Sequence, residues 1–329
     1  MIISKAPFRI SLGGGGTDLP SYYEKYGGFL IAGAIDKHIY VGANQQFYNN
    51  YSLKYSKIEI EEKINNIEHK LIREALKLLN IQPGIEITSL ADIPAKTGLG
   101  SSGAFLVSLL NTLHLYKGET VSKRVLAEEA CIIELNILKE HEGKQDKYAC
   151  AFGGIRGYEF DKHGNVKVIP FVDEDIIKLT LEENLYLFFT GIRRKNFASD
   201  ALKEQDMKIK KENKDMVEYM HEIKQIGLDT KKAFEERNFD LFGSLLNKHW
   251  LIKKKYSTQS TNEFIDKCYT FAMKKGALGG KTIGAPGGGF MMFYFDGKPK
   301  DRWNFLDNMK SLGLKHIPLK FDMMGVEKI

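Results

Sequence analysis

Near residue 100 the chain reads Pro94-Ala95-Lys96-Thr97-Gly98-Leu99-Gly100-Ser101-Ser102-Gly103. The stretch follows a predicted strand, residues 84–88, and a proline turn, and it opens directly into a strongly apolar predicted helix, residues 101–116. Glycines in such a loop allow backbone N–H groups to close around an anion. The helix N-terminus adds partial positive charge, and serine hydroxyls can cap the helix or reach a metal ion. The stretch therefore predicts a phosphate-binding loop.

Two further glycine clusters lie near the start and near the end of the chain. They read Gly13-Gly14-Gly15-Gly16-Thr17-Asp18 and Gly284-Ala285-Pro286-Gly287-Gly288-Gly289. Glycine makes up 31 of the 329 residues, and the three loops hold eleven of these 31. The share is about 9%, against a usual share of about 7%. The surplus is therefore concentrated in loops where we expect backbone to approach a ligand closely.

The order of strand-like and helix-like segments favours an α+β fold over a regular βαβ winding. A length of 329 residues predicts about two domains, and 43% hydrophobic with 27% charged residues is typical of a soluble globular protein. Besides the strand and helix already named, the first part is expected to hold strands at 8–12, 28–35, 39–44, 154–160 and 166–171 and helices at 67–79 and 122–139. We expect these strands up to residue 44 to be antiparallel.

An acidic stretch, residues 173–183, is interpreted as a hinge because the composition changes there. It predicts an N-terminal domain, residues 1–178, and a C-terminal domain, residues 179–329. For the second domain we expect strands at 185–190 and 316–320, a strand–loop–strand within 282–295, and helices at 199–236, 241–255, 262–275 and 302–312.

The charge distribution favours neither a nucleic acid nor a membrane as partner. The net charge is +6, but lysines alternate with acidic residues over 203–214, as on a solvated helix face, and the run Lys253-Lys254-Lys255 is interpreted in the same way. The three cysteines are far apart, and the first residues are already strand-like, with no leader pattern. We therefore expect a cytoplasmic protein, and the sequence leaves a monomer and a homodimer open.

Two carboxylates lie between the second and third glycine loops. Glu134 falls on the predicted helix at 122–139, and Asp146 follows twelve positions later, inside Gly143-Lys144-Gln145-Asp146. A turn at Gly143 would bring both acids toward the phosphate-binding loop. The residues alone favour two ordinary exposed acids over a site.

Three segments resemble motifs 1, 2 and 3 of the GHMP kinases, in the same order. They are residues 6–14, Pro94-x-x-x-Gly98-Leu99-Gly100-Ser101-Ser102, and Gly284-x-x-Gly287-Gly288-Gly289-Phe290. The resemblance implies a two-domain α+β fold, with a mixed or antiparallel N-terminal sheet, a helix-rich C-terminal domain and an active site in the cleft between them. It also implies transfer of the γ-phosphoryl group of ATP, with Mg²⁺, to a hydroxyl or phosphate of a small molecule.

The resemblance also implies roles for individual residues. Asp146 would face the acceptor hydroxyl, as base or as electrostatic orienter, and Arg9 would lie near the reacting oxygen. The ATP-binding residues would be Pro94, Gly98, Leu99, Gly100, Ser101, Ser102 and Gly103, and the Mg²⁺-binding residues Ser101, Ser102 and Glu134. The substrate-binding residues would be Gly15, Gly16, Thr17, Asp18, Arg193, Arg194, Lys281, Gly287 and Gly288, with Arg193, Arg194 and Lys281 holding a phosphate on the substrate.

Within the family, the chain resembles most the branch of heptose 7-phosphate kinases, alongside fucokinase-like members. The signals are residues 13–20, the stretch 143–146 followed by 151–154, and Thr190-Gly191-x-x-Arg194. The chain has Lys147 where glutamine is usual in this branch. The leading hypothesis is phosphorylation of the anomeric C1 hydroxyl of D-glycero-D-manno-heptose 7-phosphate, for surface polysaccharide synthesis. The alternatives are an anomeric kinase of an unphosphorylated sugar such as L-fucose and a non-catalytic sugar-sensing protein.

Overall fold

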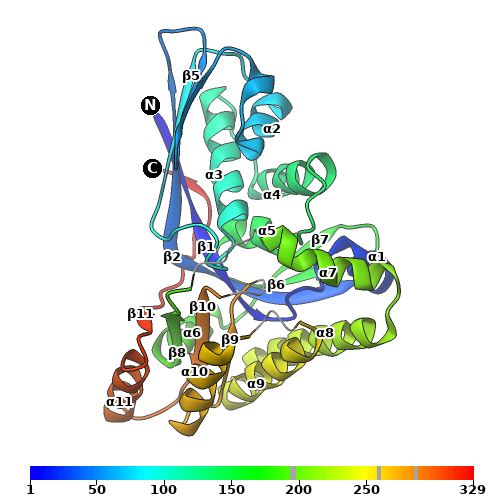
Figure 1. Ribbon diagram of the computed structural model, residues 1–329, viewed down its shortest axis with the longest axis vertical. Coiled ribbons are helices and arrows are strands. Elements are labelled where there is room, and N and C mark those ends of the chain that lie inside the picture. The colour runs from blue at the N-terminus through cyan, green and yellow to red at the C-terminus, as the bar shows by residue number, and fades with distance from the viewer. Residues whose placement is uncertain (193–197, 258–260, 285–287) are drawn as a thin grey trace.

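The computed structural model describes residues 1–192, 198–257, 261–284 and 288–329 and contains two sheets with helices against them (Figure 1). The first sheet has the order β12-β1-β2-β5-β3-β4, and β6 and β7 continue from β2. Its strands are β1 (Ile2–Gly13), β2 (Gly28–Gln45), β3 (Tyr51–Lys54), β4 (Ile58–Glu61), β5 (Ile85–Ala91), β6 (Ile155–Phe160), β7 (Val166–Pro170) and β12 (Glu327–Lys328). The second sheet has the order β11-β8-β10-β9, from β8 (Leu185–Phe189), β9 (Gly279–Thr282), β10 (Phe290–Tyr294) and β11 (Lys315–Ile317).

The helices of the N-terminal half lie on one side of the first sheet, and most of those of the C-terminal half lie beside the second (Figure 1). The first group is α1 (Pro20–Tyr26), α2 (Lys70–Leu78), α3 (Ser101–Tyr116), α4 (Lys123–Cys131), which continues as a π-helical turn (Ile132–Ile137), and α5 (Gln145–Phe152). The second is α6 (Glu174–Asn184), α7 (Ala198–Lys210), α8 (Lys214–Glu235), α9 (Phe239–Tyr256), α10 (Glu263–Lys274) and α11 (Pro299–Lys310). None of the described helices is long and apolar enough to span a bilayer.

The long strand β2 connects the part of the first sheet that contains β6 with the part that contains β5. Two separate strands, 28–35 and 39–44, are predicted here, but the structure has one continuous strand that pairs with β1 along its length. On its other edge the first part pairs with β6 and the second part with β5. The register with β1 shifts between Pro7 and Phe8, because proline cannot donate to the ladder and a bulge bends the pair. Arg9 follows this bend directly.

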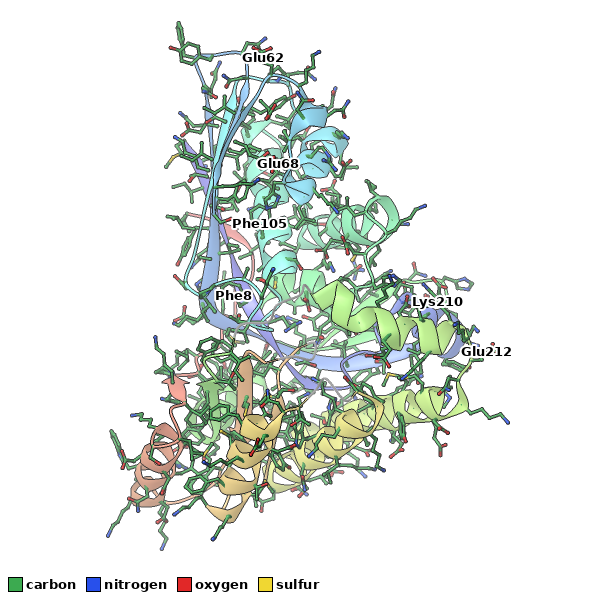
Figure 2. The ribbon with its side chains drawn as sticks, viewed as in Figure 1. Phe8, Glu62, Glu68, Phe105, Lys210 and Glu212 are labelled. Carbon is green, nitrogen blue, oxygen red and sulfur yellow. The ribbon has the colours of Figure 1, made fainter. Side chains whose placement is uncertain are left out.

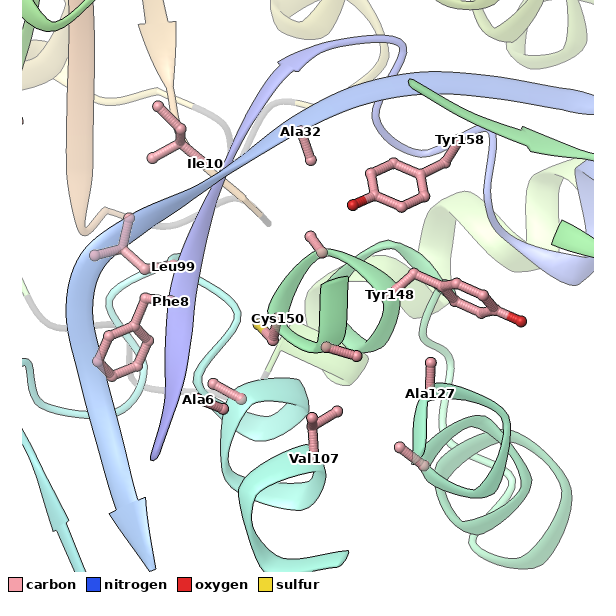
Figure 3. Close-up of a cluster of buried hydrophobic side chains, with 14 of the residues drawn as sticks. Ala6, Phe8, Ile10, Ala32, Leu99, Val107, Ala127, Tyr148, Cys150 and Tyr158 are labelled. Carbon is pink, nitrogen blue, oxygen red and sulfur yellow. The ribbon is translucent and has the colours of Figure 1, made fainter. Parts of the chain in front are cut away.

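Helix α3 forms the centre of the core. It has the predicted bounds, it begins directly after the phosphate-binding loop, and it contacts β1, β2 and α5. Figure 3 shows Phe8 of β1, Val107 of α3 and Cys150 of α5 within the buried apolar cluster that these elements share. This packing holds the loop before α3 and the first turn of α5 in a rigid frame.

The structure also differs from the predicted elements at other places. The segment predicted as a hinge is helix α6, with acidic residues in its first turn. The helix predicted over 199–236 is two helices, because Glu212 takes a left-handed conformation, φ 53°, and Asn213 caps α8 through its side chain. Strand β3 pairs with β5 in parallel, which makes the first sheet mixed.

The predicted domain division stays a prediction. Its boundary at residues 178 and 179 falls inside α6. Helix α8 packs on β1 and β2, and β12 near the end of the chain pairs with β1. Residues from beyond the boundary therefore contribute to the first sheet and its covering layer.

Candidate active site

A cavity of about 690 Å³ lies where the glycine loops meet. Its wall comes from both parts of the chain, from β1 and α3 on one side and from α9 and β9 on the other. The residues that line it and carry polar or charged groups are Arg9, Ser11, Asp18, Glu68, His69, Lys70, Lys96, Ser101, Ser102, Glu134, Glu140, Glu142, Gln145, Asp146, Gln205, His249, Lys253, Tyr256, Lys281 and Thr282. A cavity of this size is typical of a small-molecule site.

Arg9, which is buried, and Asp146, which is partly exposed, form an ion pair at the floor of this cavity. Arg9 Nε and Nη2 both lie 2.6 Å from Asp146 Oδ1, and Nη1 donates to the carbonyl oxygen of Gly98 at 2.8 Å. Arg9 is 6% exposed. Asp146 is in the first turn of α5, where the helix dipole favours a negative charge. The guanidinium therefore connects the carboxylate to the phosphate-binding loop.

The loop before α3 approaches this pair closely. Gly100 has φ 77°, and a Cβ there would lie 3.1 Å from Asp146 Cγ and from Arg9 Cγ. Gly284 of the third glycine loop has φ 71° and lies against the backbone of Gly98 so tightly that a Cβ would collide with it. Only glycine fits these two positions, and Ser101 and Ser102 then begin α3 at the cavity wall.

Glu134 lines the cavity from the π-helical turn that follows α4. Such turns are frequent at functional sites because the extra residue re-aims side chains. Glu134 is ion-paired with Lys147, which is fully buried and also donates to the carbonyl of Gly143 at 3.0 Å. Burial favours the neutral amine, but Glu134 and Glu142 outweigh it and raise the pKa of Lys147. Lys147 is therefore a permanent internal cation beside the carboxylates.

Glu142 is a second buried acid at this wall. Burial raises its pKa to about 8; Lys147 opposes this shift, and Glu134 and Asp146 add to it. Glu142 therefore holds its proton more tightly than an ordinary glutamate does.

The donor set at this wall fits a Mg²⁺ ion. Ser101, Ser102 and Glu134 line the same cavity and offer oxygen ligands only. Magnesium is bound in such sites through one or two carboxylates, with substrate phosphates and water completing its shell. One oxygen of Glu134 contacts Lys147, and the carboxylate has a second oxygen for a metal ion.

Asp18 anchors the first glycine loop to α5. Its Oδ1 accepts from the backbone N–H of Gly16 at 3.0 Å and its Oδ2 from that of Gln145 at 2.9 Å. Burial raises the pKa of Asp18, while these backbone N–H groups oppose the rise. Asp18 lines the cavity together with Gly15 and Gly16.

The structure brings most, but not all, of the sequence-predicted residues to the cavity. Those on its wall are Arg9, Gly15, Gly16, Asp18, Gly98, Gly100, Ser101, Ser102, Glu134, Asp146 and Lys281. Leu99 is buried in the apolar core, and Gly103 packs against Asp146 Cβ. The Thr17 hydroxyl donates hydrogen bonds to the carbonyl oxygens of Gly14 and Phe29. Pro94 is exposed and Gly288 packs against Ile192. Arg193, Arg194 and Gly287 lie outside the described residues.

Sequence reasoning missed two parts of the wall. Lys253, interpreted as a solvated flank, is 6% exposed and lines the cavity beside His249. One face of α9 carries His249, Lys253 and Tyr256, because these residues are spaced three and four positions apart. This spacing is the sequence pattern that could have indicated a shared, cavity-facing side of the helix. The second part is an apolar arm formed by Ile39, Leu71, Ile93 and Phe105. Figure 2 shows Phe105 beyond Phe8 along the first sheet, toward Glu68 before α2.

Comparison with known proteins finds two domains of one family along the chain. The family model described as "GHMP kinases N terminal domain" matches residues 65–154, and the family model described as "GHMP kinases C terminal" matches residues 230–306. A D-glycero-alpha-D-manno-heptose 7-phosphate kinase of Campylobacter jejuni is 29% identical, over 94% of this chain and 93% of that protein. An L-fucokinase/L-fucose-1-P guanylyltransferase of Bacteroides fragilis is 25% identical, over 88% of this chain and 34% of that protein.

A solved structure resembles the whole chain. The crystal structure of a D-glycero-D-manno-heptose 1-phosphate kinase from Bacteroides thetaiotaomicron has a TM-score of 0.79 and 26% identity, and it covers 100% of this chain and 99% of that one. The matches to both family domains and the likeness of the fold to this structure lead to one assignment: the chain belongs to the GHMP kinase family and is a kinase.

Proposed function

We propose that the protein phosphorylates the anomeric C1 hydroxyl of D-glycero-D-manno-heptose 7-phosphate, giving the 1,7-bisphosphate. The observation that carries the proposal is the pair of Arg9 and Asp146, held against the loop before α3 in one cavity. The similarity to the C. jejuni heptose 7-phosphate kinase supports the sugar. The structural relative is named a 1-phosphate kinase, so the position of transfer is part of the proposal.

The residues at the cavity floor would act on the acceptor hydroxyl. Both contacts from Arg9 engage Asp146 Oδ1, so Oδ2 is the oxygen that accepts the proton or hydrogen bond of the hydroxyl. The guanidinium also lies beside the carbonyl of Gly98 and adds positive charge where the transferred group arrives. Phosphoryl transfer depends mainly on positioning and charge neutralisation, which these groups supply.

The remaining wall would hold the nucleotide. The backbone of Gly98 and Gly100 and the first turn of α3 would bind its phosphates, with Ser101, Ser102 and Glu134 holding Mg²⁺. When bound, the metal ion neutralises negative charge on the phosphate oxygens. The apolar arm with Phe105 would receive the base, because a flat ring buries well against aromatic and aliphatic side chains.

A coupled ADP-release screen tests this function. We expect turnover with heptose 7-phosphate and none of comparable kcat/KM with heptose 1-phosphate, free heptose or L-fucose. Turnover confined to L-fucose, which the similarity to the Bacteroides fragilis fucokinase suggests as the alternative, would refute the proposed substrate.

A variant of the floor carboxylate tests the mechanism. Asp146→Asn keeps the side-chain shape but removes the charge that Arg9 holds, and we expect kcat to fall by about 10²- to 10⁴-fold, the range of a lost acid–base group. The KM for ATP should change little. Asp215→Asn, an exposed acid in the first turn of α8, is the matched control. Near-wild-type kcat in Asp146→Asn would contradict the assigned role.

A further inference from the structure

One wall of the cavity carries three buried nitrogen-bearing side chains. His249 and Lys253 come from α9, and Lys281 comes from β9. Their exposed fractions are 3%, 6% and 3%, and all three line the cavity. His249 and Lys253 are four residues apart, so they lie on the same face of α9 one turn from each other.

Contacts with the backbone of the third glycine loop hold this group in place. Lys253 Nζ donates to the carbonyl oxygen of Gly284 at 2.7 Å, and it lies 3.4 Å from the carbonyl oxygen and 3.3 Å from the hydroxyl of Thr282. Lys281 Nζ lies 3.2 Å from His249 Nδ1. The β9–β10 ladder, in which Lys281 is opposite Met292, fixes the side of the sheet to which Lys281 belongs.

The charges around Lys281 are of its own sign. Burial first, and then Lys253 and Arg9, lower the pKa of Lys281 well below its ordinary value. Burial, Lys281 and Lys253 likewise lower the pKa of His249 well below its ordinary value. Glu134, Glu142 and Asp146 are on the wall formed by the π-helical turn and α5. A dianion among the three nitrogens would favour their charged forms, because a nearby negative charge raises the pKa of an amine or an imidazole.

We propose that His249, Lys253 and Lys281 bind the phosphate that the acceptor sugar already carries, and so make the enzyme selective for a phosphorylated sugar. The inference rests on the proposed function and extends it from the reacting hydroxyl to the other end of the substrate. Two amines and an imidazole provide several donors for the oxygens of one phosphate group. The nucleotide phosphates have separate donors in the loop before α3.

Lys281→Gln tests the site, with Lys253→Gln as a second variant. Loss of one charge-assisted contact should raise KM for heptose 7-phosphate about 10- to 100-fold. KM for ATP should stay unchanged, and the residual kcat/KM for free heptose should not fall. Lys255→Gln, an exposed lysine on the same helix, is the matched control. Calorimetric titration of the wild-type enzyme with heptose 7-phosphate and with heptose should show tighter binding of the phosphorylated sugar.

Three results would overturn the inference. They are an unchanged KM for the sugar phosphate in both folded variants, an equal loss for free heptose, and a rise in KM for ATP alone. If either variant does not fold, equal wild-type affinity for the two sugars overturns it as well. Turnover of heptose 1-phosphate in place of the 7-phosphate would refute the proposed position of transfer only; Lys281→Gln would then still raise KM for the phosphorylated sugar that reacts.

Discussion

Arg9→Lys separates the charge of Arg9 from its geometry. The native side chain makes three contacts at 2.6 to 2.8 Å, two to Asp146 Oδ1 and one to the carbonyl of Gly98. Lysine keeps the positive charge but has one nitrogen, which cannot reach both partners. The variant therefore loses a charge-assisted hydrogen bond, about 1.5–3 kcal/mol, and leaves the Gly98 carbonyl without its side-chain donor, about 1–3 kcal/mol.

The combined loss is about 2.5–6 kcal/mol, and each 1.36 kcal/mol of lost transition-state stabilisation costs about tenfold in rate. We therefore expect kcat of Arg9→Lys to fall by about 10²- to 10⁴-fold. Folding should persist, because the partly buried Asp146 keeps a cationic partner. A coupled ADP-release assay with ATP and heptose 7-phosphate measures kcat and KM separately, and calorimetry measures ATP binding.

The matched control is Arg302→Lys, an arginine of α11 that is ion-paired with Glu183 and is not part of the cavity wall. Its kcat should equal that of the wild type. A folded Arg9→Lys enzyme with kcat within about threefold of wild type would refute the reasoning, because the three contacts of the guanidinium would then contribute less than about 1 kcal/mol to the transition state.

Two further predictions concern the buried charges at the acidic wall. Lys147→Met leaves Glu134 without its cation, so the free energy of unfolding at neutral pH should fall by about 3–5 kcal/mol. Urea denaturation measures this change, and a loss below about 1 kcal/mol would contradict the ion pair. The pKa of Glu142, about 8, lies above its ordinary value of 4.5, so between these two pH values the folded state holds a proton that the unfolded state releases. The free energy of unfolding should therefore decrease as pH rises from about 4.5 to about 8. Denaturation curves recorded across this range should show a smaller decrease for Glu142→Gln, and an identical pH dependence in both proteins would argue against the raised pKa.

The local pattern predicted the helix at 101–116 and the loop before it because both depend on residues close in sequence. A run of apolar residues after glycines and serines forms α3 with the predicted bounds. The same reasoning was wrong at 199–236, where the capping residue Asn213 divides the predicted helix into two. It was also wrong at 28–44, where two predicted strands form one continuous, bent strand. Such errors arise because pairing with β1 and the capping of single turns weigh more than average propensity.

The sequence by itself determined where the backbone can approach a ligand closely, since a glycine such as Gly100 permits the left-handed conformation, φ 77°, that other residues rarely adopt. It did not decide the positions of Glu134 and Asp146, because the residues alone favoured two ordinary exposed acids. Only the tertiary structure decided which side chains meet and which are buried. Arg9 contacts Asp146 across 137 positions. Lys253 faces the cavity while Lys255 faces solvent, because burial depends on which face of a helix another part of the chain covers.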